Sequence, residues 1–175
     1  MSRAFISLGS NLRPRENIAQ AISLLHSETR VLGISTVYET EPAGRPDQPS
    51  YYNCIVEIAT DMAPLELKRR VLRRIEEKLG RVRSDDPCAA RTIDLDLILY
   101  DTLVVRSDDL TLPDPDILQR PFLAIPLLEL SPGLRLPGTG APIGRIAATM
   151  PRNGMKPLAG YTKRIREEIF HDGTR

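Results

Sequence analysis

Two aspartates stand two residues apart in an apolar segment and could hold divalent cations. The segment is Ile93-Asp94-Leu95-Asp96-Leu97-Ile98-Leu99-Tyr100, which is apolar enough for a buried strand. Strand alternation places Asp94 and Asp96 on one face, roughly 7 Å apart, with Leu95, Leu97 and Leu99 on the other. Two carboxylates held in this way repel each other unless cations or arginines neutralise them. The pair therefore fits a site for divalent cations that bridge phosphates, although a solvated face with ordinary surface acids explains the strand alone equally well.

Arginine is the main cation of the chain and accounts for 20 of its 24 basic residues. Arg81, Arg83 and Arg91 bracket a polar loop that leads directly into the strand with the two aspartates. Guanidinium groups bind phosphate oxygens through two parallel hydrogen bonds. Carboxylates beside several arginines indicate phosphoryl or pyrophosphoryl transfer, in which positioning and charge neutralisation supply most of the catalysis. For any single arginine a solvated ion pair is the simpler interpretation, above all on the second predicted helix.

Tyr51 and Asn53 share one face of another predicted strand and could recognise a flat heterocycle. A tyrosine ring offers a stacking surface, and an amide beside it can both donate and accept hydrogen bonds. Ordinary sheet packing explains the two residues equally well if they stand alone. The sequence contains no GxxxxGK[ST] motif, which excludes nucleotide binding of the P-loop kind.

The elements that must position these residues follow the order β-α-β-β-α-β. Short apolar runs predict strands over residues 4–8, 31–40, 51–60 and 91–100. Apolar residues at helical spacing predict helices over residues 15–27 and 64–79. This order is that of the ferredoxin-like split βαβ plan, an α+β fold with a mostly antiparallel sheet and helices on one face. Beyond it we expect a short hairpin over 103–112, a helix over 122–130 and a charged segment over 163–170.

Composition and charge narrow the classes of function. The 175 residues are 41% apolar and 27% charged, which excludes a disordered or collagen-like chain and suits one domain, or one domain with a modest appendage. A net charge of +1 provides no bulk field toward nucleic acid or membrane. Only two histidines occur, His26 and His171, so the side chain most used for acid–base chemistry near neutrality is scarce. The 15 prolines predict long ordered loops, including the stiff segment 41–50.

The lack of a recognisable targeting signal and the pattern of cysteines lead us to expect a cytoplasmic protein. No stretch approaches the roughly 18 consecutive apolar residues of a spanning helix, and the N-terminus lacks the pattern of a signal peptide. Cys54 and Cys88 lie far apart, without a CxxC pair or clustered histidines, which is typical of thiols in a reducing compartment. Cys54 is expected in the core, and no neighbour marks Cys88 as a nucleophile.

Five motifs occur in the order found in a known family. They are Ser7-Leu8-Gly9-Ser10-Asn11-Leu12; Tyr38-Glu39-Thr40 with Pro42 and Gly44; Asp47-Gln48-Pro49 with Tyr51 and Asn53; Leu79-Gly80-Arg81-Val82-Arg83; and Arg91-Thr92-Ile93-Asp94-Leu95-Asp96. In these the chain resembles the 6-hydroxymethyl-7,8-dihydropterin pyrophosphokinases (HPPK) of folate biosynthesis, over about residues 4–136. The last motif, with the L-G-R-V-R string upstream of it, is highly specific.

The resemblance implies a transferase that moves pyrophosphate from ATP to the hydroxymethyl group of a reduced pterin and leaves AMP. It further implies two Mg²⁺ ions, with ATP as co-substrate. We expect residues 1–150 to form a single domain of this kind and residues 151–175 to be an extension of unknown role. ATP and the reduced pterin are the expected partners. No nucleic acid, membrane or obligate protein partner is expected.

The resemblance also implies roles for individual residues. Asp94 and Asp96 would hold the metal, and the catalytic set would be Arg81, Arg91 and Asp96. Either aspartate could help to deprotonate the hydroxymethyl group. The pterin ring would lie between Tyr51 and Phe122, and its edges would be recognised by Asn53, Thr40 and Ala43. The nucleotide would be bound by Glu76, Arg83, Arg91, Leu97, Ile98, Asp114 and Arg120.

Three positions depart from the family pattern. The string Leu112-Pro113-Asp114-Pro115 has Asp114 where the family usually has histidine, and an ionised aspartate would repel a triphosphate or need a metal. Cys88-Ala89-Ala90 stands where the family carries a tryptophan and then Gly-Pro, which removes an aromatic lid. Ala43 replaces a family leucine.

Three hypotheses follow from these observations. The leading one is a Mg²⁺- and ATP-dependent pterin pyrophosphokinase with altered kinetics or pterin preference. The second is a paralogue that acts on a modified pterin in a related pathway, motivated by Asp114 and the altered loop. The third is a non-catalytic binder of pterin and nucleotide, or of RNA through the sheet. The net charge of +1, the eight aromatic residues and the lack of a recognisable aromatic RNP segment disfavour RNA.

Overall fold

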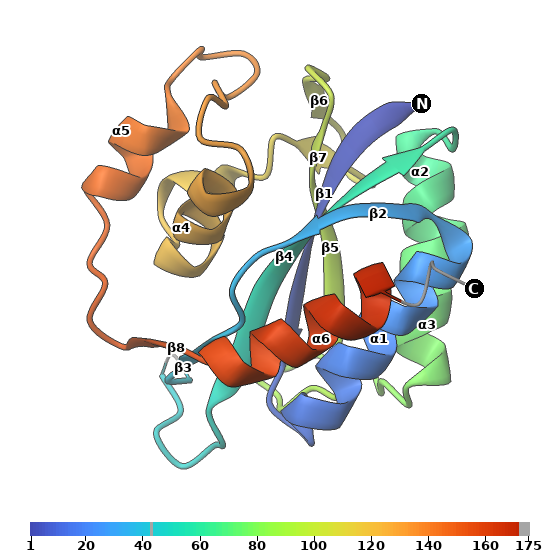
Figure 1. Cartoon of the computed structure of the whole chain (residues 1–175), viewed down its shortest axis with the longest axis vertical. Coiled ribbons are helices and arrows are strands. Elements are labelled where there is room, and N and C mark those ends of the chain that lie inside the picture. The colour runs from blue at the N-terminus through green and yellow to red at the C-terminus, as the bar shows by residue number, and fades with distance from the viewer. Residues whose placement is uncertain (43, 172–175) are drawn as a thin grey trace.

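An antiparallel sheet forms the centre of the computed structural model, which describes residues 1–42 and 44–171 (Figure 1). Its strands are β1 (Ser2–Ser10), β2 (Arg30–Ile34), β3 (Tyr38–Thr40), β4 (Tyr51–Thr60), β5 (Asp94–Tyr100) and β8 (Met155–Pro157). They lie in the order β5-β1-β4-β3-β8, and β2 also pairs with β4. Every pairing in the sheet is antiparallel. The predicted α+β fold with a mostly antiparallel sheet is confirmed.

The prediction of one continuous strand over 31–40 is wrong, because the segment is divided into two strands, β2 and β3. Val37, which lies between these strands, turns its backbone groups to the C-terminal part of the chain. Val37 N–H donates to Thr162 Oγ1 at 2.9 Å, and Val37 C=O accepts from Leu158 N–H at 2.9 Å. A strand cannot continue where both of these groups are bonded away from the neighbouring ladder.

A β-bulge on β5 changes which side chains lie behind the two aspartates. Asp96 pairs with Ser7 of β1 and Leu97 with Ile6, but Leu99 pairs with Phe5, so one extra residue stands on β5. Such a residue reverses the alternation beyond it. Leu95 and Leu97 therefore lie in one core cluster and Leu99 in the other. The prediction that all three leucines share a face is wrong for Leu99.

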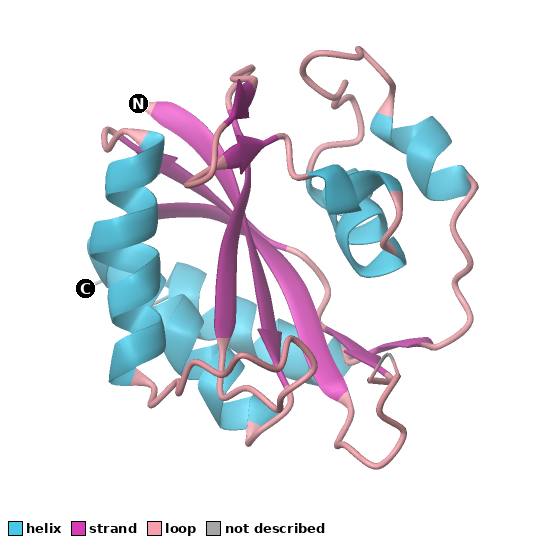
Figure 2. Ribbon diagram, turned by 180° about the vertical axis from the view of Figure 1, so that it is seen from behind, coloured by secondary structure: helices cyan, strands magenta, loops and turns pink. Residues whose placement is uncertain are grey.

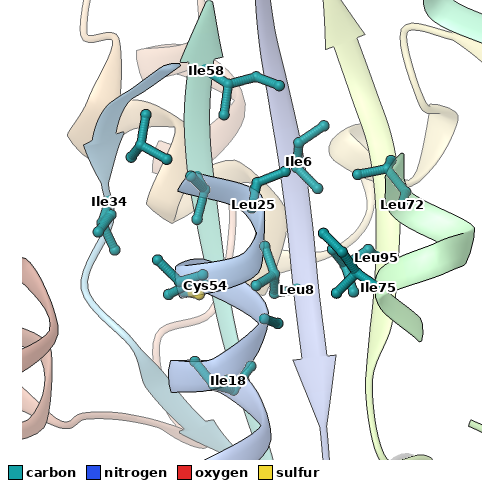
Figure 3. Packing of buried hydrophobic residues seen from close by; sticks show 14 of the residues in the cluster. Ile6, Leu8, Ile18, Leu25, Ile34, Cys54, Ile58, Leu72, Ile75 and Leu95 are labelled. Carbon is teal, nitrogen blue, oxygen red and sulfur yellow. The ribbon is translucent and has the colours of Figure 1, made fainter. Parts of the chain in front are cut away.

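Helices α1 (Pro14–Glu28), α2 (Pro64–Glu66), α3 (Arg73–Lys78) and α6 (Ala159–His171) cover one face of the sheet, as Figure 2 also shows from behind. The π-helical turn η1 (Leu67–Leu72) joins α2 to α3, so the segment predicted as one helix over 64–79 is helical almost throughout. Proline begins both α1 and α2, where its missing N–H has no helical partner to lose. Ile18 and Leu25 of α1 pack on Leu8 of β1 and Cys54 of β4 in this face's core (Figure 3).

Helices α4 (Pro121–Leu130) and α5 (Ile143–Ala148) lie on the opposite face of the sheet (Figure 1). There Leu123 and Leu127 are buried in a second cluster with Phe5, Ile55 and Leu99. The expectation of helices on one face only is wrong, because the central strands are apolar on both faces and both must be covered. The predicted hairpin is confirmed as β6 (Val105–Arg106) and β7 (Thr111–Leu112), and the short helix η2 (Pro115–Leu118) leads into α4.

The C-terminal segment packs on the rest of the chain. Strand β8 pairs with β3, and helix α6 contributes Tyr161, Ile165 and Ile169 to the first core cluster. The Arg166 guanidinium donates two hydrogen bonds to the Ile34 carbonyl, at 2.9 and 2.7 Å. A boundary at residue 150 stays a prediction. Among the described helices none has both the length and the apolar character needed to cross a membrane.

Candidate active site

A cavity of about 420 Å³ opens beside the two aspartates of β5. It is bounded by β1, β4 and β5 and by the segment that leads through η2 into α4. The structure brings nine of the sequence-predicted site residues together in its wall: Thr40, Tyr51, Asn53, Arg91, Asp94, Asp96, Asp114, Arg120 and Phe122. Ala43, which was also predicted there, lies outside the described residues.

Asp94 and Asp96 share the cavity-facing side of β5 but have different partners. Asp94 Oδ1 accepts a hydrogen bond from Arg81 Nη1 at 2.6 Å, and its Oδ2 accepts one from Arg91 Nη1 at 2.5 Å. The Asp96 side chain is exposed to the cavity and has no hydrogen bond or ion pair with any residue that the structure describes. One carboxylate is thus neutralised by two arginines, while the other is open.

Negative charge accumulates around Asp96. Desolvation by the surrounding protein, followed by the charges of Asp94, Glu76 and Asp114, raises the pKa of Asp96 to about 7, and Arg81 only partly opposes them. A cation placed between the carboxylates would relieve this repulsion. The site therefore has the electrostatics of a cation site.

The donor set fits Mg²⁺ held jointly with a phosphate ligand. Carboxylate oxygens are the hard donors that Mg²⁺ prefers, and Mg²⁺ in proteins usually takes one or two of them, with water and substrate phosphates completing its octahedron. Within residues 1–42 and 44–171 no group of three or more Asp, Glu, His or Cys side chains is placed to hold a metal ion. Asp94 and Asp96 can therefore supply part of a coordination sphere but not all of it.

Glu76 of α3 fixes the position of Arg81 from behind the cavity. Its carboxylate is buried, accepts from Leu95 N–H at 2.9 Å and from Arg81 Nη1, and lies 3.4 Å from Arg83 Nη2. Burial raises the pKa of Glu76, although these donors oppose the rise. Burial alone would lower the pKa of Arg81, but the carboxylates of Asp94 and Glu76 raise it overall.

The loop between α3 and β5 encloses a second cavity, of about 310 Å³. Its wall contains three guanidinium groups, from Arg81, Arg83 and Arg91, and two carboxylates, from Asp85 and Asp86. Arg91 lines both cavities. The arrangement allows one ligand with several anionic groups to run from the aspartates to this loop past Arg91.

The other end of the main cavity is suited to a flat polar ring. Asn53 Nδ2 donates to Thr40 Oγ1 at 2.7 Å, which orients the amide, and a Cβ on Gly9 would lie only 3.0 Å from Asn53 Oδ1. Because glycine has no Cβ, Gly9 leaves the space that the Asn53 amide occupies. Tyr51 and Phe122 contribute aromatic rings from β4 and α4, and the Arg120 guanidinium lies 5.9 Å from the Phe122 ring.

Leu97 and Ile98, predicted near the nucleotide, have buried side chains in the two core clusters. Only the backbone of Ile98 reaches toward the cavity wall, since its carbonyl accepts from Asp114 N–H at 2.9 Å. Asp114 Oδ1 in turn accepts from Asp116 N–H at 2.9 Å and caps η2. Burial raises the pKa of Asp114.

Asn11 and Gln48 connect two loops at the cavity, and their residue types alone predict no role for them. Asn11 Nδ2 donates to Gln48 Oε1 at 3.1 Å, and Gln48 Nε2 donates to the Cys88 carbonyl at 2.8 Å. Asn11 Oδ1 also accepts from Arg91 N–H at 2.7 Å. Both residues belong to the motifs of the family resemblance, but neither amide carries a chemistry that could be read without the fold.

Comparison with known proteins, by family and by individual relatives, finds the same kind of enzyme each time. The family described as 7,8-dihydro-6-hydroxymethylpterin-pyrophosphokinase (HPPK) matches residues 5–132. A 2-amino-4-hydroxy-6-hydroxymethyldihydropteridine pyrophosphokinase of Haemophilus influenzae is 38% identical over 142 residues, which are 79% of this chain and 88% of that protein. The protein of the same name from Pseudomonas aeruginosa is 36% identical over 163 residues, 91% of this chain and 99% of that one.

Longer proteins contain a similar segment. The folic acid synthesis protein fol1 of Schizosaccharomyces pombe is 38% identical over 161 residues, so the chain spans 90% of its own length but only 22% of this relative's. A solved HPPK-DHPS structure in complex with substrates aligns with 97% of this chain and 45% of that one, at a TM-score of 0.65 and 12% identity. Wild-type HPPK-DHPS of Plasmodium falciparum aligns at a TM-score of 0.64 and 12% identity, over 95% and 46%. At this identity the structures support the fold alone.

Proposed function

Because the chain belongs to the 7,8-dihydro-6-hydroxymethylpterin-pyrophosphokinase (HPPK) family, we propose that it transfers pyrophosphate from ATP to 6-hydroxymethyl-7,8-dihydropterin in folate synthesis. The products are AMP and the pterin diphosphate. The observation that carries the proposal is a single cavity with Asp94 and Asp96 at one end and Tyr51, Asn53 and Phe122 at the other. A pterin and a triphosphate can meet in such a cavity.

The carboxylates and arginines divide the phosphate chemistry between them. Asp94 and Asp96 would hold two Mg²⁺ ions, which supply charge neutralisation for the triphosphate when bound. Arg91 would contact the phosphates from the wall shared by the two cavities, and Arg81 holds the other oxygen of Asp94. Guanidinium forks fit the oxygens of a transferring group and stabilise the charge that develops on them.

The pterin end of the cavity would orient the nucleophile. Asn53, held by Thr40, can match the donor and acceptor edge of the ring, and Tyr51 and Phe122 would stack on its faces. The hydroxymethyl oxygen then attacks the β-phosphorus of ATP and loses its proton. The bond from that phosphorus to the α,β-bridging oxygen breaks, and AMP leaves. Holding the two reactants in this geometry supplies a large part of the rate enhancement.

Other residues would serve the nucleotide indirectly or at the rim. Glu76 acts through Arg81, and Arg83 lines the loop cavity. Asp114 and Arg120 line the main cavity beside Asp116. Leu97 and Ile98 can contribute only through the backbone or through the packing of β5.

The test is an assay with ATP, Mg²⁺ and 6-hydroxymethyl-7,8-dihydropterin in which AMP is followed over time. AMP and pterin diphosphate formed in equal amounts would support the proposal. Binding of both ligands without formation of AMP would defeat it and would favour a modified pterin as substrate or a non-catalytic role. Omission of Mg²⁺ serves as the internal control.

A further inference from the structure

Guanidinium groups stand at the Asp94 carboxylate, where a divalent cation would bind. Both oxygens of this carboxylate are bonded to guanidinium groups, one to Arg81 and one to Arg91, and the Asp94 side chain is only 19% exposed. While both arginines remain, they occupy one lone pair of each oxygen, and their positive charges oppose the approach of a divalent cation. We propose that Arg91 blocks the cation site at Asp94 until a phosphate group displaces it, so that the nucleotide and the divalent cation bind cooperatively. The inference rests on the proposed function for its ligand, a nucleoside triphosphate.

Arg91 is the arginine that can leave. Arg81 is 16% exposed and is bonded to Glu76 as well as to Asp94, and Glu76 is itself fixed by Leu95 N–H. Moving Arg81 would leave the buried carboxylate of Glu76 without its main cation, and this would cost substantial free energy. Arg91 is 28% exposed, and its other side-chain hydrogen bond to a described residue runs from Nη2 to the Pro87 carbonyl at 2.5 Å.

The position of Arg91 gives it a second partner close at hand. Its side chain lines both the main cavity and the loop cavity. A rotation of the guanidinium away from Asp94 therefore carries it to a place where phosphate oxygens would lie, without leaving the site. A phosphate offers the same two parallel hydrogen bonds as a carboxylate, so the exchange keeps the guanidinium bonded.

The composition of the site makes the exchange favourable only when both ligands are present. A divalent cation alone would have to compete with Arg91 and would find no third protein carboxylate among the described residues. A triphosphate alone would face the open charge of Asp96 and would have to compete with Asp94 for Arg91. When both ligands are present, the cation binds the carboxylates of Asp94 and Asp96, and the phosphates bind Arg91. Each ligand then raises the affinity for the other by the same factor, as linkage requires.

The first experiment measures Mn²⁺ affinity by calorimetry in the absence of nucleotide. Arg91→Met should bind Mn²⁺ more tightly than the unmodified chain, by about tenfold, within the range usual for coupled sites. Arg83→Met is the matched control, because it removes the same charge beside Glu76 without touching Asp94. An equal gain in both variants would mean a general charge effect and would overturn the proposal. So would unchanged or weaker Mn²⁺ binding by Arg91→Met.

The second experiment measures the affinity for α,β-methylene ATP with all metal chelated by EDTA. Asp94→Asn should tighten this binding, since the neutral amide releases Arg91. Asp96→Asn removes the same charge from the same face but contacts no arginine, so it should tighten binding less. An equal effect of the two variants would contradict the proposal.

Thermal unfolding of each variant identifies those that fail to fold, and Arg91→Lys provides a second variant that retains charge without the guanidinium fork. Neither binding experiment involves a pterin or turnover. A chain that forms no AMP but shows these affinities would defeat the proposed function and leave the blocking role of Arg91 intact. A chain that forms AMP without these affinity differences would do the opposite.

Discussion

Asp94 and Asp96 stand on one face of one strand, but their partners assign them different properties. Asp94 is paired with Arg81 and Arg91, whereas Asp96 faces the cavity with a pKa raised to about 7. Strand alternation in the sequence is sufficient to predict that the two carboxylates share a face and that cations or arginines must neutralise them. It is not sufficient to predict which of the two carboxylates pairs with the arginines. That pairing depends on Glu76, a buried residue of α3 that holds Arg81 in place.

At the residue scale we predict that Asp96→Asn abolishes formation of AMP while the fold is retained. The amide keeps the size of the side chain but is a poor ligand for Mg²⁺, and no described hydrogen bond of Asp96 is lost. The measurement is AMP production together with circular dichroism. Asp61→Asn is the control, since Asp61 is exposed and paired only with the N-terminus at 3.4 Å. Undiminished turnover in Asp96→Asn would exclude this carboxylate from the metal site.

The same substitution should change how the stability of the metal-free chain depends on pH. The pKa of Asp96 in the folded chain, about 7, lies above its ordinary value of 3.8. The protonated carboxyl therefore stabilises the fold fully below about pH 4, and this contribution is lost as the pH rises through 7. Asp96→Asn should lack this loss, so urea unfolding in EDTA at pH 5 and pH 8 should show a smaller decrease for the variant. A larger decrease would contradict the origin of the raised pKa.

A third prediction at this scale concerns Asp114, which combines a structural and an electrostatic effect. Asp114→His should increase nucleotide affinity, because a repelling carboxylate is replaced by a donor, with an effect of about 1 to 2 kcal/mol. It should also lower stability by about 1 kcal/mol, because the acceptor for Asp116 N–H is lost. Asp114→Asn separates the two, since it removes the charge and keeps an acceptor. Unchanged nucleotide affinity in both variants would show that Asp114 has little bearing on phosphate binding.

At the scale of elements, regular patterns were predictable and interruptions were not. Strand β4 has the predicted bounds, and the helices α1 and α4 each lie within about one residue of theirs. The bulge on β5 depends on its register with β1, and the division of β2 from β3 depends on Thr162 and Leu158 more than 120 residues away. Such long-range partners leave no local signal in the sequence. Helices on the second face follow from the apolar character of both faces of β4, where Cys54 and Val56 lie in one core cluster and Ile55 lies in the other.

Two glycines in helical regions should respond oppositely to substitution by alanine. Gly80 ends α3 with φ +78°, and its conformation directs the chain toward Arg81. Gly80→Ala should lower the free energy of unfolding by about 1 kcal/mol, because alanine disfavours the left-handed region. Gly160 of α6 has open space around its Cα, and Gly160→Ala should raise the free energy of unfolding by about 0.5 to 1 kcal/mol. Urea unfolding of the pair tests both signs, and equal shifts would contradict the assignment.

At the scale of the whole molecule, the near-zero net charge conceals a segregation of charges around one cavity. Acidic side chains on β5 and η2 face arginines from the loop after α3 and from the start of α4. The sheet supplies the rigid support for this arrangement, since the two core clusters cover both of its faces. The placement of opposite charges at one end of the sheet follows from β1, β4 and β5 being neighbours, which the β-α-β-β-α-β order already implied.

The contribution of residues 151–171 to this support leads to the last prediction. Removal of everything after Met150 would delete β8 and α6, and with them the buried side chains of Tyr161, Ile165 and Ile169. Each such side chain contributes about 1.5 to 3 kcal/mol, so the sum is comparable to the 5 to 15 kcal/mol that hold a typical domain together. The truncated chain should therefore lose its cooperative thermal transition. Ile165→Ala should lower the free energy of unfolding by about 2 to 5 kcal/mol, whereas Lys163→Ala on the exposed side of the same helix should change it by less than about 0.5 kcal/mol. If the truncated chain unfolds cooperatively at the temperature of the full chain, residues 1–150 form a domain by themselves, and the packing of α6 is dispensable for it.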